Sequence, residues 1–181
     1  LPTGKIGICA GPFTANSDTF DLEIIGKGGH SSQPHDSINP ILIGSQITNV
    51  LHHIIPQKVN AEERAVLAVT EFHAGSAKNI IPDRLVIGGS VRTFSQQVRE
   101  RIAQQIAMQV QHTVAAHGAD YNFTYNDGYS SVINDEQLTA VVEGVIQQHF
   151  PSDTILHIGP FMGGEDFSAF LTKVPGVFIA I

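Results

Sequence analysis

One short turn places a histidine where it could take part in catalysis. The segment Ile25–Ser37 reads IGKGGHSSQPHDS, so His30 follows three glycines and precedes two serines. An imidazole can donate a hydrogen bond to a developing oxyanion, and flanking glycines allow the backbone to approach a ligand closely. The alternative is a strand-to-helix connection with an exposed histidine beside it. His35 is more typical of an ordering residue than of a catalyst.

Two polar residues further along the chain could hold a substrate. Arg92 lies in GGSVRTFS on an otherwise apolar stretch, and its guanidinium fork could bind a carboxylate through two hydrogen bonds. Asn79 lies in the loop before that stretch and offers both a donor and an acceptor. The alternative for Arg92 is an ordinary solvent-facing strand arginine.

A glycine pair near the C-terminus is the last candidate. In MGGEDFS, Gly163 and Gly164 precede two carboxylates at an expected helix start. The glycines could line a substrate groove with their backbone. Alternatively, Glu165 and Asp166 only complement the positive end of the helix dipole.

Other chemistries find no support in the sequence. The nine histidines form no H-E-x-x-H motif, and Cys9 is the only cysteine, which excludes an internal disulfide framework. A reducing, cytoplasmic location fits that single thiol. The sequence contains neither a phosphate-binding loop nor a G-x-S-x-G elbow. We therefore expect no metal site built from this chain alone.

Composition narrows the classes of partner. The chain has 181 residues, 42% of them hydrophobic, and a formal charge of −7 without a basic run, which argues against nucleic-acid binding. No stretch approaches the roughly 18 apolar residues of a membrane span. The chain begins without Met and ends on the apolar run VFIAI, so we expect a piece of a longer protein.

Hydrophobic periodicity predicts the elements that position the candidates. Strands are expected over residues 20–24, 65–73, 85–94 and 121–125, and helices over 43–54 and 98–114. Asp36 or Ser37 should cap the first helix and Pro56 should end it, whereas Ser95 should cap the second. The order β-α-β-β-α-β predicts an α+β, ferredoxin-like unit, a four-stranded antiparallel sheet with both helices on one face. The rest of the chain is expected to form part of an incomplete α/β layer. Its predicted elements are a helix over residues 138–146, a strand over 154–158 and an apolar strand over 177–181.

Taken together, these motifs resemble the M20 family of metal-dependent peptidases and amidohydrolases, in its aminoacylase, hippurate hydrolase and auxin-conjugate hydrolase branch. The resemblance rests on LPTG at 1–4, GPFTANSDTFDLEIIGKGGHSSQPHDSINPI at 11–41, GSAKNIIPDRLVIGGSVRTFS at 75–95 and MGGEDFS at 162–168. It implies a catalytic α/β domain with two divalent ions (zinc, manganese or cobalt) and an inserted ferredoxin-like lid that forms a homodimer. Residues 17–127 match the lid, and residues 1–16 and 128–181 match parts of the catalytic domain.

The resemblance also implies roles for the candidates. The lid histidine at His30 would reach a neighbouring subunit's active site and polarise the scissile carbonyl. Asn79 and Arg92 match groups that hold the substrate, a small N-acyl amino acid or peptide, and Gly163 and Gly164 match glycines beside the cleft. The family's metal ligands and general-base glutamate would precede Leu1, and a last histidine ligand would follow Ile181. The fragment alone should therefore bind no metal pair and be inactive.

Two functions of different class remain open. The chain is either part of a metal-dependent amidohydrolase, or a non-catalytic dimerisation and interaction module with a ferredoxin-like fold. The metal content of the chain and its turnover of an N-acetyl amino acid would distinguish them.

Overall fold

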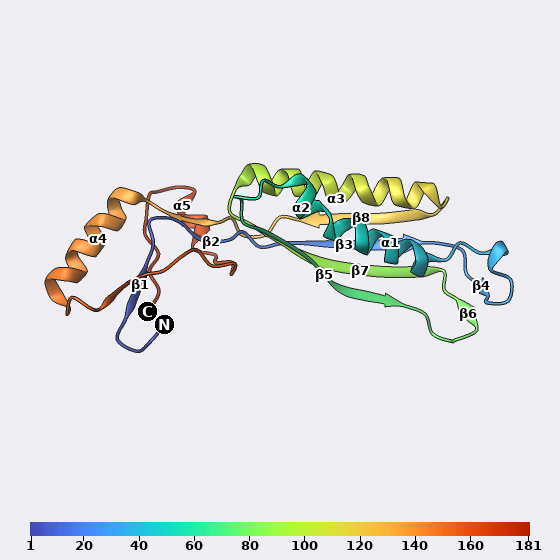
Figure 1. Ribbon diagram of the computed structural model, residues 1–181, viewed down its shortest axis with the longest axis horizontal. Helices are drawn as coiled ribbons and strands as arrows, with labels where there is room; N and C mark the ends of the chain where they lie inside the picture. Colours follow the sequence, from blue (N-terminus) through green and yellow to red (C-terminus); the bar gives the residue numbers. More distant parts are fainter. The chain divides into compact units, whose positions relative to one another are not determined.

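The computed structural model describes residues 1–181, and the chain forms two compact units (Figure 1). The inserted unit comprises Asp18–Asp127. The outer unit comprises Leu1–Ser17 and Gly128–Ile181. Each unit has its own sheet arrangement.

The inserted unit is built on one antiparallel sheet with strand order β5-β7-β3-β8. Its helices all lie on the same face of that sheet (Figure 1). This confirms the predicted α+β class and antiparallel sheet. The elements are β3 (Asp18–Ile25), α1 (Pro40–His52), α2 (Ile54–Lys58), β5 (Ala65–Ala74), β7 (Arg84–Thr93), α3 (Gln96–Ala116) and β8 (Asp120–Asn126).

The core of the inserted unit lies between the sheet and its helices. Alternation along β3 buries Phe20, Leu22 and Ile24 to 1% exposure or less. The predicted stripe of α3 is confirmed, since every fourth residue along it is at most 5% exposed: Val98, Ile102, Ile106, Val110 and Val114. Ser95 caps this helix as predicted, accepting a hydrogen bond from the Val98 amide at 3.4 Å.

The predicted boundaries of the first helix were wrong at both ends. Asn39 is the N-cap residue, and its side chain accepts from the Ile41 amide at 3.0 Å, because a 3₁₀ turn over Pro34–Asp36 delays the helix start. Pro40 occupies the first turn, where a missing amide costs nothing. The helix ends at His52, and Pro56 sits near the start of α2 rather than terminating α1.

Gly89 on β7 allows an aromatic ring to cross the strand. A Cβ at this position would lie 2.3 Å from Phe20 Cζ and 2.5 Å from the Ala68 carbonyl oxygen. We expect Gly89→Ala to lower the free energy of unfolding by about 1–3 kcal/mol, because the strand must shift to admit the methyl group. Chemical denaturation would measure this loss. Gly144→Ala is the control, since nothing lies within 4 Å of its added Cβ; an equal loss for both variants would contradict the steric reason.

A buried ion pair joins the two ends of the inserted unit. Arg99 on α3 donates from Nε to Asp18 Oδ2 at 2.8 Å and from Nη2 to Oδ1 at 2.5 Å. The two side chains are 8% and 0% exposed, and Asp127 Oδ1 lies 3.6 Å from Arg99 Nη2. Tyr125 donates to Asp18 at 2.9 Å, and burial, followed by the Asp18 charge, raises the pKa of its hydroxyl. The first and last residues of the unit are thus held to one guanidinium.

The outer unit contains two small strand pairs. β1 (Ile6–Ile8) runs parallel to β10 (Ile155–His157), and β2 (Gly11–Thr14) runs antiparallel to β9 (Val132–Asn134). The predicted strand over 177–181 does not form; that run makes a single bridge between Ala180 and Gly7. It is held by the buried Asn134 side chain, whose Nδ2 donates to the Phe178 carbonyl at 2.9 Å and whose Oδ1 accepts from the Phe178 amide at 2.8 Å.

The predicted apolar face of α4 (Glu136–His149) is largely uncovered in this unit. Leu138, Val141 and Val145 are 39%, 61% and 51% exposed, whereas Ile146 is buried. The apolar periodicity therefore predicts the helix correctly. Its apolar face, however, is not covered by a core within the described residues. None of the helices in the chain combines the length and the hydropathy needed to span a bilayer.

Candidate functional site

The turn that carries His30 is held by a second, very short strand pair. β4 (Gly29–His30) pairs antiparallel with β6 (Ile80–Ile81), so that His30 lies opposite Ile80. The Ser31 amide then donates to the Asn79 carbonyl at 3.0 Å. Because the turn is tied on both sides of His30, its backbone is fixed although the side chain is exposed.

The His30 ring is engaged through one nitrogen only. Nδ1 lies 2.8 Å from the Ser32 hydroxyl and accepts a hydrogen bond from the Ser32 amide at 3.2 Å. Nε2 has no hydrogen-bond partner in the chain. The ring can therefore offer Nε2 to a ligand without breaking an existing contact.

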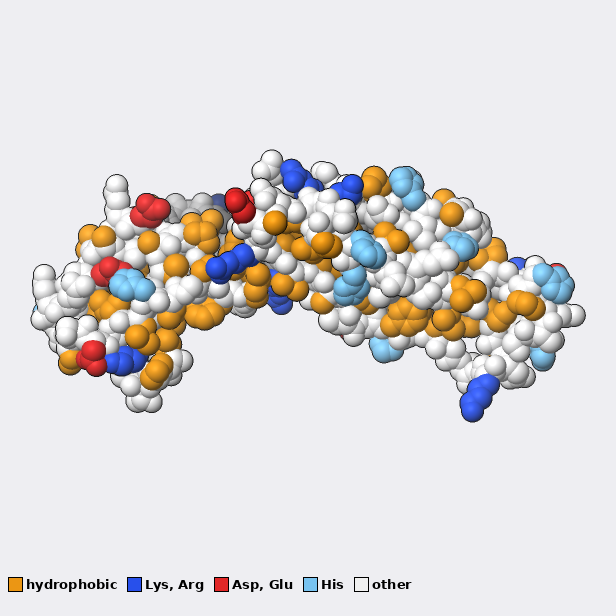
Figure 2. All heavy atoms as spheres, viewed as in Figure 1, with side chains coloured by type: hydrophobic (Ala, Val, Ile, Leu, Met, Phe, Trp, Pro, Cys, Tyr) orange, Lys and Arg blue, Asp and Glu red, His pale blue; other side chains and the backbone are white.

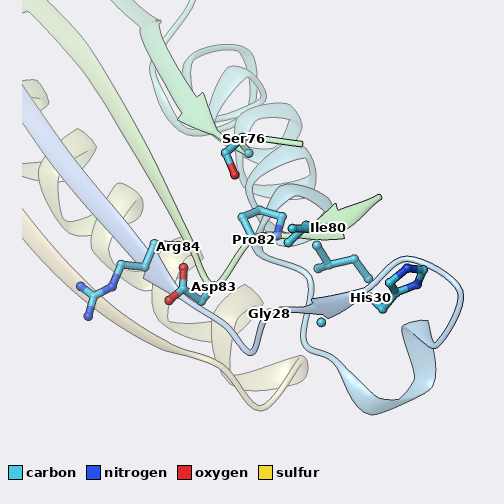
Figure 3. Close-up of a pocket in the computed structure, with 10 residues that line it drawn as sticks. Gly28, His30, Ser76, Ile80, Pro82, Asp83 and Arg84 are labelled. Carbon is cyan, nitrogen blue, oxygen red and sulfur yellow. The ribbon is translucent and has the colours of Figure 1, made fainter. Parts of the chain in front are cut away.

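His30 lines an open cavity of the inserted unit. This open cavity has a volume of about 760 Å³, within the range of small-molecule sites. Its walls come from the turn before His30 and from the loop and strand start around β6, including Gly28, Ser76, Pro82, Asp83 and Arg84 (Figure 3). Sequence reasoning did not single out the last four as site residues, although all of them lie in the quoted motif at 75–95.

Arg84 lines this cavity, but its side chain points away from His30 (Figure 3). Its Nη1 donates to Glu23 Oε1 at 2.6 Å, and Asn122 donates to the other Glu23 oxygen at 2.8 Å. The hydrogen bond from Arg84, followed by that from Asn122, lowers the pKa of Glu23. The guanidinium is therefore committed to a neighbouring carboxylate rather than free for a ligand.

The predicted substrate residues lie at different ends of the sheet. Asn79 lies beside the His30 turn, to which it contributes a backbone carbonyl. Arg92 lies eight residues beyond Arg84 on β7, where it pairs with Val66 near the Asp18 end of β3. At roughly 3.3 Å per residue, that places Arg92 about 26 Å along the strand from the cavity end. The structure brings His30 and Asn79 together and separates both from Arg92.

The glycine pair belongs to the outer unit and is exposed. A Cβ on Gly163 would meet nothing within 4 Å, so packing does not require a glycine there. The helix α5 (Ser168–Leu171) starts after the carboxylates and has no side-chain cap, and Glu165 accepts instead from the Asp166 amide at 3.1 Å. These carboxylates therefore provide no side-chain cap for α5.

Metal-binding groups of this chain do not converge. No group of three or more His, Cys, Asp or Glu side chains is arranged to hold a metal ion. The one close carboxylate–imidazole contact of the outer unit, Glu143 Oε1 to His157 Nε2 at 2.9 Å, has no third ligand. On the face drawn in Figure 2, Lys and Arg side chains form no continuous patch.

Comparison with known proteins identifies relatives of the whole chain. Residues 14–118 match the family model for the M20 peptidase dimerisation domain. The chain is 44% identical over 137 residues to an N-acyl-L-amino acid amidohydrolase of Geobacillus stearothermophilus, covering 76% of the chain and 37% of that relative. It is 34% identical to an N-acetyl-L-cysteine deacetylase of Bacillus subtilis (strain 168), covering 98% of the chain and 42% of the relative.

Solved structures agree with these sequence matches. The dinuclear metal-binding M20 peptidase YXEP of Bacillus subtilis superposes with a TM-score of 0.76 at 30% identity, over 99% of this chain and 44% of that one. A protein from methicillin-resistant Staphylococcus aureus gives a TM-score of 0.87 at 26% identity, over 98% and 46%. The chain thus spans less than half the length of the proteins it matches.

Proposed function

This chain belongs to the M20 family, and we propose that it is part of a metal-dependent amidohydrolase that cleaves the amide bond of N-acyl amino acids or small peptides. The match to the dimerisation domain and the relatives named as amidohydrolase and deacetylase support this assignment. In this proposal the inserted unit is the lid, corresponding to the predicted 17–127, and the outer unit is part of the catalytic domain. The single cysteine fits a cytoplasmic enzyme.

The residues of this chain do not fit a metal pair, so two divalent ions (zinc, manganese or cobalt) would have to be held elsewhere in the parent protein. When bound, such ions supply a nucleophilic water and polarise a carbonyl. His30 would donate from Nε2 to the carbonyl oxygen as negative charge develops there. Arg92 would bind the substrate carboxylate, and Asn79, Gly163 and Gly164 would line the site.

The separation of His30 from Arg92 carries this proposal. Arg92 lies about 26 Å along β7, by strand rise, from Arg84, which borders the cavity that His30 lines. A small N-acyl amino acid cannot touch both within one copy. A site that uses both must take Arg92 from one subunit and His30 from the other, which requires a homodimer.

Subunit complementation tests this arrangement. We co-express His30→Ala and Arg92→Ala parent proteins with different affinity tags and purify the hybrid dimer. One of its two sites then contains both residues, so we expect about half of the unmodified turnover per dimer, while each variant alone is nearly inactive. If the hybrid dimer were as inactive as the two single variants, both residues would belong to the site of one subunit, and the proposal would be contradicted.

A non-catalytic dimerisation module is the second candidate, and the description of the matched domain favours it for this chain taken alone. We expect the 181-residue chain to sediment as a dimer, to contain no stoichiometric metal and to leave an N-acetyl amino acid intact. Stoichiometric metal together with turnover would show that the chain is itself an enzyme. Sedimentation as a monomer at high concentration would contradict dimerisation.

A further inference from the structure

We propose that Ser32 is a positioning residue that holds His30 in the tautomer with its proton on Nε2. The inference rests on the proposed function for its catalytic meaning, but the tautomer itself follows from the geometry of the turn. It assigns a role to a serine that the motif alone leaves unexplained.

The backbone amide of Ser32 is the first of two donors that this residue directs at His30 Nδ1. An amide N–H can only donate, and the Ser32 amide donates to His30 Nδ1 at 3.2 Å. Nδ1 must therefore present its lone pair. A neutral imidazole has one protonated nitrogen, so the proton lies on Nε2.

The hydroxyl of Ser32 adds a second donor to the same atom. Its Oγ lies 2.8 Å from Nδ1, at ordinary O–H···N distance. Two donors from one residue on Nδ1 oppose the alternative tautomer and also restrict rotation of the ring. An exposed histidine without such donors exchanges freely between its two tautomers.

The turn holds the Ser32 amide in place for this contact. The neighbouring Ser31 amide is bound to the Asn79 carbonyl at 3.0 Å, and the Gln33 amide donates to the His30 carbonyl at 2.9 Å. The strand pairing of His30 with Ile80 fixes the other side. Asn79 contributes here through its backbone, which links the loop before β6 to the orientation of the histidine.

The consequence is a hydrogen-bond donor on Nε2 that no group of the chain occupies. Nε2 has no partner in the chain, so its N–H is available to a substrate carbonyl oxygen. In the other tautomer Nε2 would present a lone pair, which repels a developing oxyanion. Ser32 would thus keep Nε2 of His30 protonated, so that this nitrogen acts as a hydrogen-bond donor.

Long-range ¹H–¹⁵N correlation spectra of the ¹⁵N-labelled chain test the tautomer directly, at a pH where the imidazoles are neutral. We expect His30 to show a protonated Nε2 and an unprotonated Nδ1, whereas exposed His35 shows averaged nitrogens. Ser32→Ala should move His30 toward averaging, and Ser31→Ala, the matched control, should not. A protonated Nδ1, averaging equal to that of His35, or a spectrum unchanged by Ser32→Ala would overturn the inference.

Turnover of the parent protein tests the catalytic meaning. Loss of one hydrogen bond predicts that Ser32→Ala lowers kcat about fivefold with little change in KM, and that Ser31→Ala has no effect. In a His30→Ala background, Ser32→Ala should cause no further loss, because its effect passes through the ring. An equal further loss would show a merely structural role and overturn the inference. If His30→Ala itself left kcat unchanged, the proposed role of His30 would fail while the spectra still decided the tautomer.

Discussion

Replacing His30 by alanine in the parent protein should lower kcat by about 10²–10³-fold, the usual cost of removing one oxyanion donor. The effect is large because the donor acts only on charge that develops in the transition state. KM should change much less than kcat. Steady-state kinetics on an N-acetyl amino acid would measure both parameters.

The metal content of the His30→Ala protein should stay unchanged, since His30 belongs to no group of three or more potential metal ligands in this chain. His35→Ala is the matched control: its ring is exposed, and Asp36 at 3.7 Å is its only ionic neighbour. We expect normal kcat for that variant. Turnover by His30→Ala equal to that of the control would remove His30 from the mechanism.

Breaking the buried pair between Asp18 and Arg99 should cause the largest loss of stability. Arg99→Ala would remove the guanidinium that neutralises the fully buried Asp18 carboxylate, and Asp18→Ala would remove the nearest carboxylate from a guanidinium side chain that is 8% exposed. Removing one partner of a buried pair costs about 3–5 kcal/mol, because the remaining charge is desolvated without compensation. Urea denaturation of the chain would measure the free energy of unfolding.

The double variant separates charge from packing. Asp18→Leu combined with Arg99→Met removes both charges and should recover much of the stability lost by either alanine variant. The exposed pair Arg84–Glu23 is the surface comparison, and Arg84→Ala should change stability only slightly. Equal losses for Arg99→Ala and Arg84→Ala would show that burial of the ion pair does not matter.

Local patterns identified the main strands and helices of the inserted unit. The period-two alternation of β3 and the period-3.6 stripe of α3 each identify an element and its buried face, because packing on a single apolar face leaves that signature. The start of α1 was misplaced, since several residues before it can serve as caps and only the preceding 3₁₀ turn selects Asn39. The exposed face of α4 shows the same limit: periodicity reports an apolar side but not what covers it.

Part of the candidate site could likewise be predicted from the sequence, and part of it could not. His30 could be singled out from its glycines, and its neighbour Ser32 lies two residues away in the sequence. The cavity could not, because Ser76, Asp83 and Arg84 reach it only through the pairing of β4 with β6. Sequence spacing also gave no sign that Asn79 serves the His30 turn through its backbone.

The sequence by itself determined the fold class of the inserted unit, the family resemblance and the identity of His30 and Arg92 as candidates, since these depend on residue type and local order. Only the tertiary structure decided which candidates can act together. β7 pairs antiparallel with β3 over the full length of β3. Arg84 therefore lies at the end of the sheet next to the His30 turn, and Arg92 lies near the opposite end. That reversal is a property of strand register, which local residue patterns do not encode.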